Sequence, residues 1–461
     1  MRLFVLFVFN TLLFALLSAC SAPEMLPGRE PQSSNPILPG YYADPSLVIY
    51  EGTAYLYATL DPWGGETLGL WESDDFQHWS FRELNWPTKA ACTSPTSKSA
   101  GVWAPSVVRG GDGRFYMYVS VGNEVWAGVA DHPAGPWKNL LGDQPLIPEN
   151  FKPGFHMIDA EAFIDEDGQA WLYWGSGWNW VNGKCWAVKL SDDMKTFDGT
   201  VHDVTPPNYF EAPFMYKHGG RYHLMYSSGR TPLDTYQVHS AVGDSPLGPF
   251  MEEPNSPILV TDIDKNVVSP GHHAVFVENG QPWILYHRHS IPYSPDVINR
   301  QICADPLAFD GNGHFLPVTP THRGPVFTQR KASRQALPAL ASASSQSGGL
   351  NGPENVLDDN YATKWQAFGD EKESWIQLDF GKLKSFSVNE VRLEYAWKTY
   401  RLKLESSSDG RHWEVLVDQS KTPVKGSPLR FQQEGAGRYL RLVFPGGEGE
   451  PVPALFEWQV Y

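Results

Sequence analysis

The chain of 461 residues is long enough for two domains, and 41% hydrophobic with 13% aromatic residues supports a large core. Its 18 Trp, 42 Gly and 38 Pro favour a β-rich, turn-rich architecture over a helical one. The net charge of −16, with no run of Lys or Arg, argues against nucleic acid as a partner and favours a neutral ligand bound through aromatic faces and hydrogen bonds.

The first segment has the pattern of an export signal. Met1-Arg2 is followed by an apolar run over residues 3–17 that is short for a membrane span. The following "LSAC" resembles the bacterial lipoprotein cleavage box, with ordinary cleavage near Ala19 or Ala22 as the alternative. We expect a signal peptide over 1–20, a Pro- and Ser-rich tether over 21–34, and a cell-envelope or cell-surface location. Contact with the membrane is expected only through a lipid anchor at Cys20.

The remaining cysteines are Cys92, Cys185 and Cys303. Their number is odd, and none has a metal-type or nucleophile-type spacing. We therefore expect all three to be packing residues.

A repeated unit dominates residues 35–331. Five stretches begin near residues 43, 103, 158, 210 and 271, and each combines an apolar strand, a Gly-containing turn and a second alternating strand. The turns are Glu51-Gly52, Asp112-Gly113, Asp167-Gly168, Gly219-Gly220 and Asn279-Gly280. Units of about 50 to 60 residues are typical of propeller blades. The prediction is an all-β chain whose first domain is a five-bladed β-propeller, in preference to tandem β-sandwiches.

Polar residues recur at the start of each unit. Aligning the units places Asp44, Ala104, Asp159, Glu211 and His272 at one equivalent position. The innermost strands of a propeller line one central channel, so these residues are predicted to meet in space.

Three carboxylates around a concave pocket suit glycoside hydrolysis, in which one acts as acid, one as base, and a third raises the pKa of the acid. Aromatic residues at the rim would stack on sugar faces. The candidates are Trp103, Trp174, Trp178 and Trp180. Arg288 and Arg300 are candidates for binding sugar hydroxyls or pairing with the acids, and Arg288 is favoured.

Structural roles remain as alternatives for these acids. Asp44 precedes a proline and Glu211 precedes Ala-Pro, so either could belong to a turn. In "IDAEAFIDEDGQAWLYWGS", Asp159 is assigned to the site and residues 165–167 to a solvated turn, while Glu161 is left undecided.

These motifs resemble glycoside hydrolase family 43 over roughly residues 35–328. The resemblance is carried by "ADPS", "GVWAPSV", "IDAEAFIDEDGQAWLYWGS", "YFEAPFMYKHGGRYHLMYSS", "SPGHHAVF" and the stretch from "WILYHRH" to "RQICADPLAFD". It implies an inverting mechanism with Asp44 as general base, Glu211 as general acid and Asp159 as pKa modulator. It further implies that His272 helps hold an axial calcium ion or water cluster, with no cofactor needed for catalysis.

A compositional shift at 331–347 marks a second domain, placed at 332–461. Its alternating segments predict a β-sandwich of jelly-roll type. "ENVLDDNYATKWQA", "WIQLDFG", "SSSDGRHWEVL" and "FEWQVY" resemble a discoidin or coagulation factor C-type domain, close to carbohydrate-binding module family 32. That resemblance implies a structural calcium site formed by Asp358, Asn360, Thr363 and Glu457, oxygen donors that suit calcium. The alternatives are a plain loop, and a packing role without glycan binding.

The sequence therefore predicts an inverting exo-glycosidase acting on polysaccharide side chains. Terminal α-L-arabinofuranosyl units are the favoured substrate, with β-xylosyl, galactosyl or galactofuranosyl units as alternatives. A non-catalytic glycan-binding propeller lipoprotein is the alternative from another class. We expect a monomer whose partner is an oligosaccharide or polysaccharide.

Overall fold

The computed structural model describes residues 35–461 apart from 99, 297, 323, 326–335 and 448. The expected signal peptide, tether and lipid anchor at Cys20 lie outside these residues, as does much of the segment at the expected domain boundary. The only helices in the described part are the 3-10 helices η1 (Glu149–Phe151), η2 (Ile263–Lys265) and η3 (Pro353–Leu357). None of the helices described is long and apolar enough to cross a membrane.

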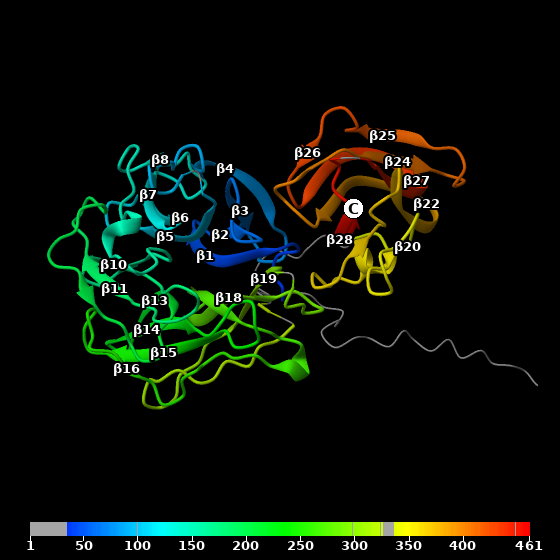
Figure 1. Ribbon diagram of the computed structural model, residues 1–461. Helices are drawn as coiled ribbons and strands as arrows, with labels where there is room; N and C mark the ends of the chain where they lie inside the picture. The colour runs from blue at the N-terminus through cyan, green and yellow to red at the C-terminus, as the bar shows by residue number, and fades with distance from the viewer. Residues whose placement is uncertain (1–34, 99, 297, 323, 326–335, 448) are drawn as a thin grey trace, which may run out of the picture.

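Five antiparallel sheets form a β-propeller, which confirms the predicted fold (Figure 1). Each of the first four blades has four strands in chain order, and the fifth has three within the described residues. Blade one contains β1 (Tyr42–Tyr50), β2 (Thr53–Leu60), β3 (Thr67–Ser73) and β4 (Ser80–Thr88). Blade two contains β5 (Val102–Arg109), β6 (Phe115–Val121), β7 (Glu124–Ala130) and β8 (Lys138–Asn139). Blade three contains β9 (Glu161–Ile164), β10 (Ala170–Trp174), β11 (Trp186–Lys189) and β12 (His202–Asp203). Blade four contains β13 (Glu211–His218), β14 (Arg221–Ser228), β15 (Gln237–Gly243) and β16 (Met251–Glu252). Blade five contains β17 (Gly271–Glu278), β18 (Gln281–His289) and β19 (Arg300–Pro306).

The first described residues close the ring against the fifth blade. The Ile37 N–H donates to the Ile302 carbonyl at 2.8 Å. The Asn35 side chain accepts from the Ala304 N–H at 2.7 Å and donates to the Ala304 carbonyl at 2.9 Å. The segment before β1 therefore covers the outer edge of β19, so that both ends of the propeller sequence meet in one blade.

The hairpin between the first two strands of each blade turns where the sequence predicted. Gly52, Gly113, Gly168, Gly220 and Gly280 all have positive φ values, between 77° and 86°. Side chains are rarely tolerated in this region, so glycine is required for these tight turns.

The propeller core consists of apolar clusters packed between neighbouring blades. Cys92, Cys185 and Cys303 are buried in these clusters as free thiols, which confirms that they are packing residues.

The C-terminal domain is a β-sandwich of the predicted discoidin-like type. The strands of its main sheet are β20 (Leu340–Ala343), β21 (Trp365–Gln366), β22 (Glu373–Leu393), β24 (Lys403–Ser407), β25 (Glu414–Asp418), β27 (Leu429–Pro445) and β28 (Ala454–Val460). A two-stranded sheet pairs β23 (Thr399–Tyr400) with β26 (Val424–Lys425). The long strands β22 and β27 pair along most of their length and enclose one apolar core.

The sandwich packs against blades one and five of the propeller (Figure 1). The Trp71 indole N–H donates to the Ser427 carbonyl at 2.9 Å, and the Gln301 side chain donates to the Tyr361 carbonyl at 3.0 Å. Ala396 joins the apolar cluster that contains Tyr42 and Trp71. The second domain is therefore fixed to the propeller by buried contacts.

Candidate active site

The innermost strands begin with a residue in the left-handed backbone region. The φ values are 51° at Asp44, 46° at Ala104, 57° at Asp159, 54° at Ala212 and 39° at His272. This conformation costs an L-residue about 1–2 kcal/mol, and such strain is typical of functional sites. In blades one, two, four and five it coincides with a shift in strand register. The five blades therefore share this backbone feature, and in blades one, three and five the left-handed residue is polar.

The sequence alignment was wrong by one residue in blade four. The left-handed residue there is Ala212, and Ala212-Pro213 corresponds to Asp44-Pro45 of blade one. Glu211 instead occupies the preceding position, where it pairs with Ser227 as Ala43 pairs with Thr59. Glu211 thus brings its carboxylate from a different backbone position, on a side chain one methylene longer than that of aspartate.

A chain of hydrogen bonds links one blade to the next at this level. Each bond runs from a left-handed residue's N–H to a side chain of the preceding blade. The pairs are Ala104 with Thr59 at 2.8 Å, Asp159 with Ser120 at 3.0 Å, His272 with Ser227 at 2.9 Å and Asp44 with His287 at 3.3 Å. These bonds fix the residues that carry the side chains of the site.

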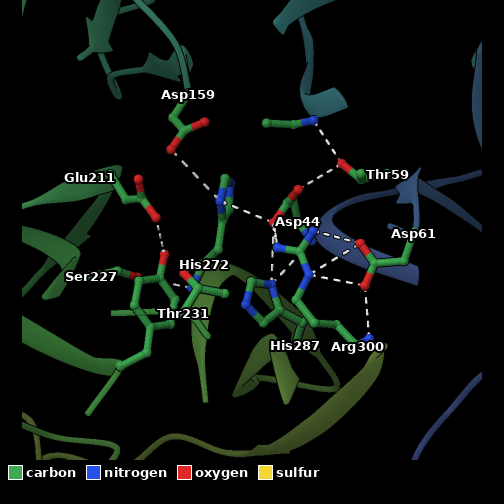
Figure 2. A network of polar contacts seen from close by, with 12 residues as sticks. Asp44, Thr59, Asp61, Asp159, Glu211, Ser227, Thr231, His272, His287 and Arg300 are labelled. Carbon is green, nitrogen blue, oxygen red and sulfur yellow. Dashed lines mark hydrogen bonds and ion pairs between the residues drawn. The ribbon is translucent and has the colours of Figure 1, made fainter. Parts of the chain in front are cut away.

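Asp44 is surrounded by donors and is 1% exposed. Its Oδ1 accepts from Arg300 Nη1 at 3.0 Å, and its Oδ2 accepts from the Thr59 hydroxyl at 2.7 Å (Figure 2). Burial alone would raise the pKa of Asp44, but the Arg300 guanidinium, with two nearby histidines, outweighs it and holds the pKa far below its usual range. Asp44 is therefore ionised at neutral pH.

Arg300 is held in place by a second buried carboxylate. Asp61 accepts from the Arg300 backbone N–H at 2.7 Å and from Arg300 Nη2 at 2.6 Å. A guanidinium bound in this way has a fixed orientation. Asp61 therefore aims Arg300 at Asp44.

Asp159 is buried with few donors. Its Oδ2 lies 3.8 Å from His272 Nδ1, and its Oδ1 has no hydrogen-bond partner among the described residues (Figure 2). Burial and the negative charges of Glu211 and Asp44 raise the pKa of Asp159 well above its usual value. Part of the reason lies in blade three, where Gly175 takes the strand position that carries Thr59 in blade one and offers no side chain.

Glu211 is a buried carboxyl group with a raised pKa. Its carboxylate accepts from the Tyr236 hydroxyl at 2.7 Å and from the Ser176 hydroxyl at 3.2 Å. Burial and the charge of Asp44 raise the pKa of Glu211 to about 7, although the Tyr236 and Ser176 hydrogen bonds lower it. Glu211 is thus a carboxyl group that can give and take a proton near neutral pH, beside one that is ionised there.

Two carboxyl groups with separated pKa values are the elements of acid–base glycoside hydrolysis. The sequence model of the glycosyl hydrolases family 43 matches residues 33–315, and that of the F5/8 type C domain matches residues 340–457. The protein belongs to glycoside hydrolase family 43. Both resemblances inferred from the motifs are confirmed.

Relatives of this family 43 enzyme differ in their substrates. A β-D-galactofuranosidase from Aspergillus niger is 33% identical over 311 residues, covering 64% of this chain and 87% of that protein. An arabinoxylan arabinofuranohydrolase from Paenibacillus polymyxa is 25% identical over 511 residues, covering 95% of this chain and 78% of that protein. A solved glycoside hydrolase structure has a TM-score of 0.78 and 27% identity, covering 92% of this chain and 98% of that one. The last similarity extends over both domains.

Two residues predicted to bind substrate, Trp174 and Arg288, are buried and do not face the site. Trp174 is fully buried in the cluster beside Phe151 and Phe197, and it has no surface with which to stack on a sugar. Arg288 is equally buried, and it contacts the Asn35 carbonyl and His322 on the side of β18 away from the site. Arg300, the alternative considered from the sequence, is the arginine of the active site.

The aromatic rim consists of Trp63, which was not predicted, together with the predicted Trp103 and Trp178. Trp63 is 44% exposed and lies over the Arg300 guanidinium, with 4.9 Å between the guanidinium carbon and the ring centroid. Trp178 is 42% exposed and stacks on His156, and Trp103 contacts the same histidine. A sign for Trp63 was present in the sequence, because it follows Asp61-Pro62 directly after the second strand of blade one.

His272 is placed as a partner of the carboxylates. Its Nδ1 lies 3.3 Å from Asp44 Oδ1 and points between Asp44 and Asp159 (Figure 2). The described residues contain no group of three His, Cys, Asp or Glu side chains arranged to hold a metal ion. The axial calcium ion or water cluster expected at His272 stays a prediction.

The remaining acids between residues 161 and 167, at the start of blade three, differ in burial and in the residues they contact. Glu161 lies against Ser106, and burial raises its pKa to about 8. Asp165 is 8% exposed and accepts from Lys217 at 2.5 Å and from the Tyr222 hydroxyl at 2.6 Å. The prediction of a solvated turn is therefore wrong for Asp165, which ties blade three to blade four, whereas Glu166 and Asp167 are exposed.

The four residues predicted for calcium binding in the C-terminal domain do converge. The Asp358 carboxylate accepts from the Thr363 hydroxyl at 2.7 Å, and both Asp358 and Glu457 accept from the Asn360 N–H at 3.1 Å. Burial and the charge of Asp358 raise the pKa of Glu457 well above its usual value. The Asn360 side-chain nitrogen is buried without a partner among the described residues. This excess of oxygen donors and negative charge fits a hard cation.

Proposed function

We propose that the protein is an inverting exo-glycosidase that removes terminal α-L-arabinofuranosyl units from polysaccharide side chains. The observation that carries this proposal is the difference between Asp44 and Glu211. Asp44 has a pKa far below its usual range, whereas Glu211 has one of about 7. The first suits a general base and the second a general acid.

In this mechanism Glu211 gives its proton to the glycosidic oxygen as the bond to the anomeric carbon breaks. Asp44 takes a proton from the water that attacks the opposite face of the sugar, so the anomeric configuration inverts. Asp159 is assigned as the pKa modulator, because the charge of Glu211 raises the pKa of Asp159 and the two neighbouring carboxyl groups therefore disfavour being ionised together. Arg300 and Thr59 orient the base through direct hydrogen bonds.

A second candidate sugar is the β-D-galactofuranosyl unit, favoured by the 33% identical relative from Aspergillus niger. The two furanose rings have the same configuration from C1 to C4, and they differ only in the substituent that C4 carries. One pocket can therefore accept both, and the choice depends on space around that substituent. β-Xylosyl and galactosyl units are less favoured alternatives.

A panel of para-nitrophenyl glycosides tests the proposal. We expect release from the α-L-arabinofuranoside, weaker release from the β-D-galactofuranoside, and little from the β-xyloside or β-galactopyranoside. Release from the galactofuranoside alone would make the β-D-galactofuranosyl unit the favoured substrate in place of the α-L-arabinofuranosyl unit. No release from any member would favour the non-catalytic glycan-binding alternative.

We further propose a structural calcium ion in the C-terminal domain, held by oxygens of Asp358, Asn360, Thr363 and Glu457. Its support is the convergence of these groups around buried negative charge that Arg392 only partly offsets. The ion would stabilise the domain and takes no part in the reaction.

Export and lipid anchoring at Cys20 are likewise proposed, from the "LSAC" box after a short apolar run. Metabolic labelling with a palmitate analogue tests the anchor. Labelling of the natural chain and none of the Cys20→Ala variant is the expected result, and unlabelled natural chain would contradict it.

A further inference from the structure

A cavity lies between the two domains, at the end of the propeller where β1 and β19 begin. Its volume is about 370 Å³, within the range of about 300–1,000 Å³ that is typical of small-molecule sites. The loop between β18 and β19 supplies one wall, and the segment from Leu350 to Gln366 of the sandwich supplies the other. Because buried contacts fix the sandwich to the propeller, the cavity is formed before any ligand arrives.

The lining of the cavity combines polar and apolar groups and is close to neutral. Lys364 is the one charged residue among the described residues that line it, and it is paired with Glu394 and lies over the Tyr41 ring. The side-chain amides of Asn299 and Gln366 line the cavity and make no hydrogen bond to another described residue. Amides donate and accept at once, as sugar hydroxyls do, so this lining suits a neutral polyol better than an ion.

The position of the cavity relates it to the reaction. Asn299 is the residue before Arg300, whose guanidinium contacts the carboxylate of Asp44 at 3.0 Å. Tyr41 lies three residues before Asp44, at the start of the same blade. Consecutive Cα atoms are about 3.8 Å apart, so the wall of the cavity joins directly the start of the strand that carries Arg300.

We propose that this interdomain cavity binds neutral sugar units of the substrate on the leaving-group side of the scissile bond. The C-terminal domain then contributes directly to substrate selection through Gln366. This inference rests on the glycosidase function proposed above, but it makes no use of which terminal sugar is removed.

Binding is tested in a Glu211→Gln background, which retains the substrate uncleaved. Neutral oligosaccharides from arabinoxylan, arabinan and galactan are the probes, in an array followed by calorimetry. Gln366→Leu and Asn299→Leu remove one amide each from opposite domains, and Gln432→Leu, an exposed site in β27, is the matched control. Loss of one neutral hydrogen bond predicts about fivefold to tenfold weaker binding for each cavity variant and none for the control.

Turnover provides the second readout. Both cavity variants should lower kcat/KM for the bound oligosaccharide while leaving it within about twofold for the para-nitrophenyl glycoside, which lacks the outer sugar units. Using two variants from different domains guards against a folding defect in one, and thermal unfolding identifies such a defect.

Three results would overturn the proposal. They are binding that neither variant weakens, an array on which no neutral oligosaccharide is retained, and equal losses on the oligosaccharide and the para-nitrophenyl glycoside. If Gln366-dependent binding persists but no arabinofuranoside is cleaved, the proposed sugar is wrong and the cavity assignment stands.

Discussion

The protein contains two buried acidic clusters, one in each domain, with opposite arrangements of positive charge. In the propeller, Arg300 is fixed by Asp61 and directed at Asp44 alone, so Asp44 and Glu211 titrate far apart. In the sandwich, the nearby Arg392 is hydrogen-bonded to Glu390 at 3.2 Å and only partly offsets the charge around Glu457.

The difference indicates two uses of the same side chains. Carboxyl groups with an internal counter-ion on one member acquire distinct pKa values and can transfer protons. Carboxyl groups without a dedicated counter-ion carry unbalanced charge that a cation from solution can neutralise. The propeller cluster is therefore assigned to chemistry and the sandwich cluster to stability.

The largest expected effect comes from Glu211→Gln. Removing the acid should lower kcat by about 10²–10⁴-fold for substrates with poor leaving groups, and far less for activated aryl glycosides that need no protonation. Steady-state kinetics on both substrate types measures this. Glu161→Gln, which removes another carboxyl group with a raised pKa, is the matched control and should leave the ratio between the two unchanged. Equal losses on both substrates would remove Glu211 from the acid role.

Arg300→Lys tests the counter-ion. A lysine cannot bind Asp61 and Asp44 together, so we expect kcat/KM to fall by about tenfold to a hundredfold. Because Arg300 lowers the pKa of Asp44, the variant should lose activity at higher pH on the acid side than the natural enzyme does. Arg288→Lys, a buried arginine facing away from the site, should alter stability without moving the pH profile. A pH profile unchanged in both variants would contradict the role of Arg300.

Calcium removal tests the sandwich cluster. Saturating calcium at about 100 times its Kd would stabilise the folded state by about 2.7 kcal/mol, so a chelator should lower the Tm by the matching amount. Hydrolysis of aryl glycosides by the still-folded protein should not change. The Glu457→Gln variant should be insensitive to the chelator, and a natural protein with the same insensitivity would rule out the site.

The smallest effect concerns the Glu211 environment. The activity of the natural enzyme should fall as pH rises through about 7, where Glu211 loses its proton. The Tyr236 hydrogen bond lowers this pKa, so Tyr236→Phe should move the alkaline limb upward by one pH unit or less, about 1 kcal/mol. Tyr173→Phe, whose hydroxyl bonds the distant Pro246 carbonyl, should not move it. A downward shift would contradict the assignment.

The sequence was sufficient for the repeat, the blades and the candidate carboxylates, because hairpin turns and strand alternation are local features. The sequence was insufficient where the register of the backbone decides which residues are equivalent between blades. Ala212 and Glu211 differ by one position, and only the left-handed conformation shows which of them corresponds to Asp44.

The sequence also could not show toward which side of a strand a side chain points, or which distant residue it pairs with. Arg288 and Arg300 are both arginines of blade five, and the sheet turns the first away from the site while the second meets Asp44. Asp61 was missed because its partner lies 239 residues away and no local pattern links the two. Trp174 resembled a rim residue by composition, but its strand directs it into the core.

The central claim is that Asp44 and Glu211 act as base and acid in a single displacement. Proton NMR of the first product formed, recorded before mutarotation, tests this most directly. For an α-L-arabinofuranoside, an inverting mechanism predicts that β-L-arabinofuranose appears first and the α form only later. Initial formation of the α anomer would contradict the assignment of these two residues.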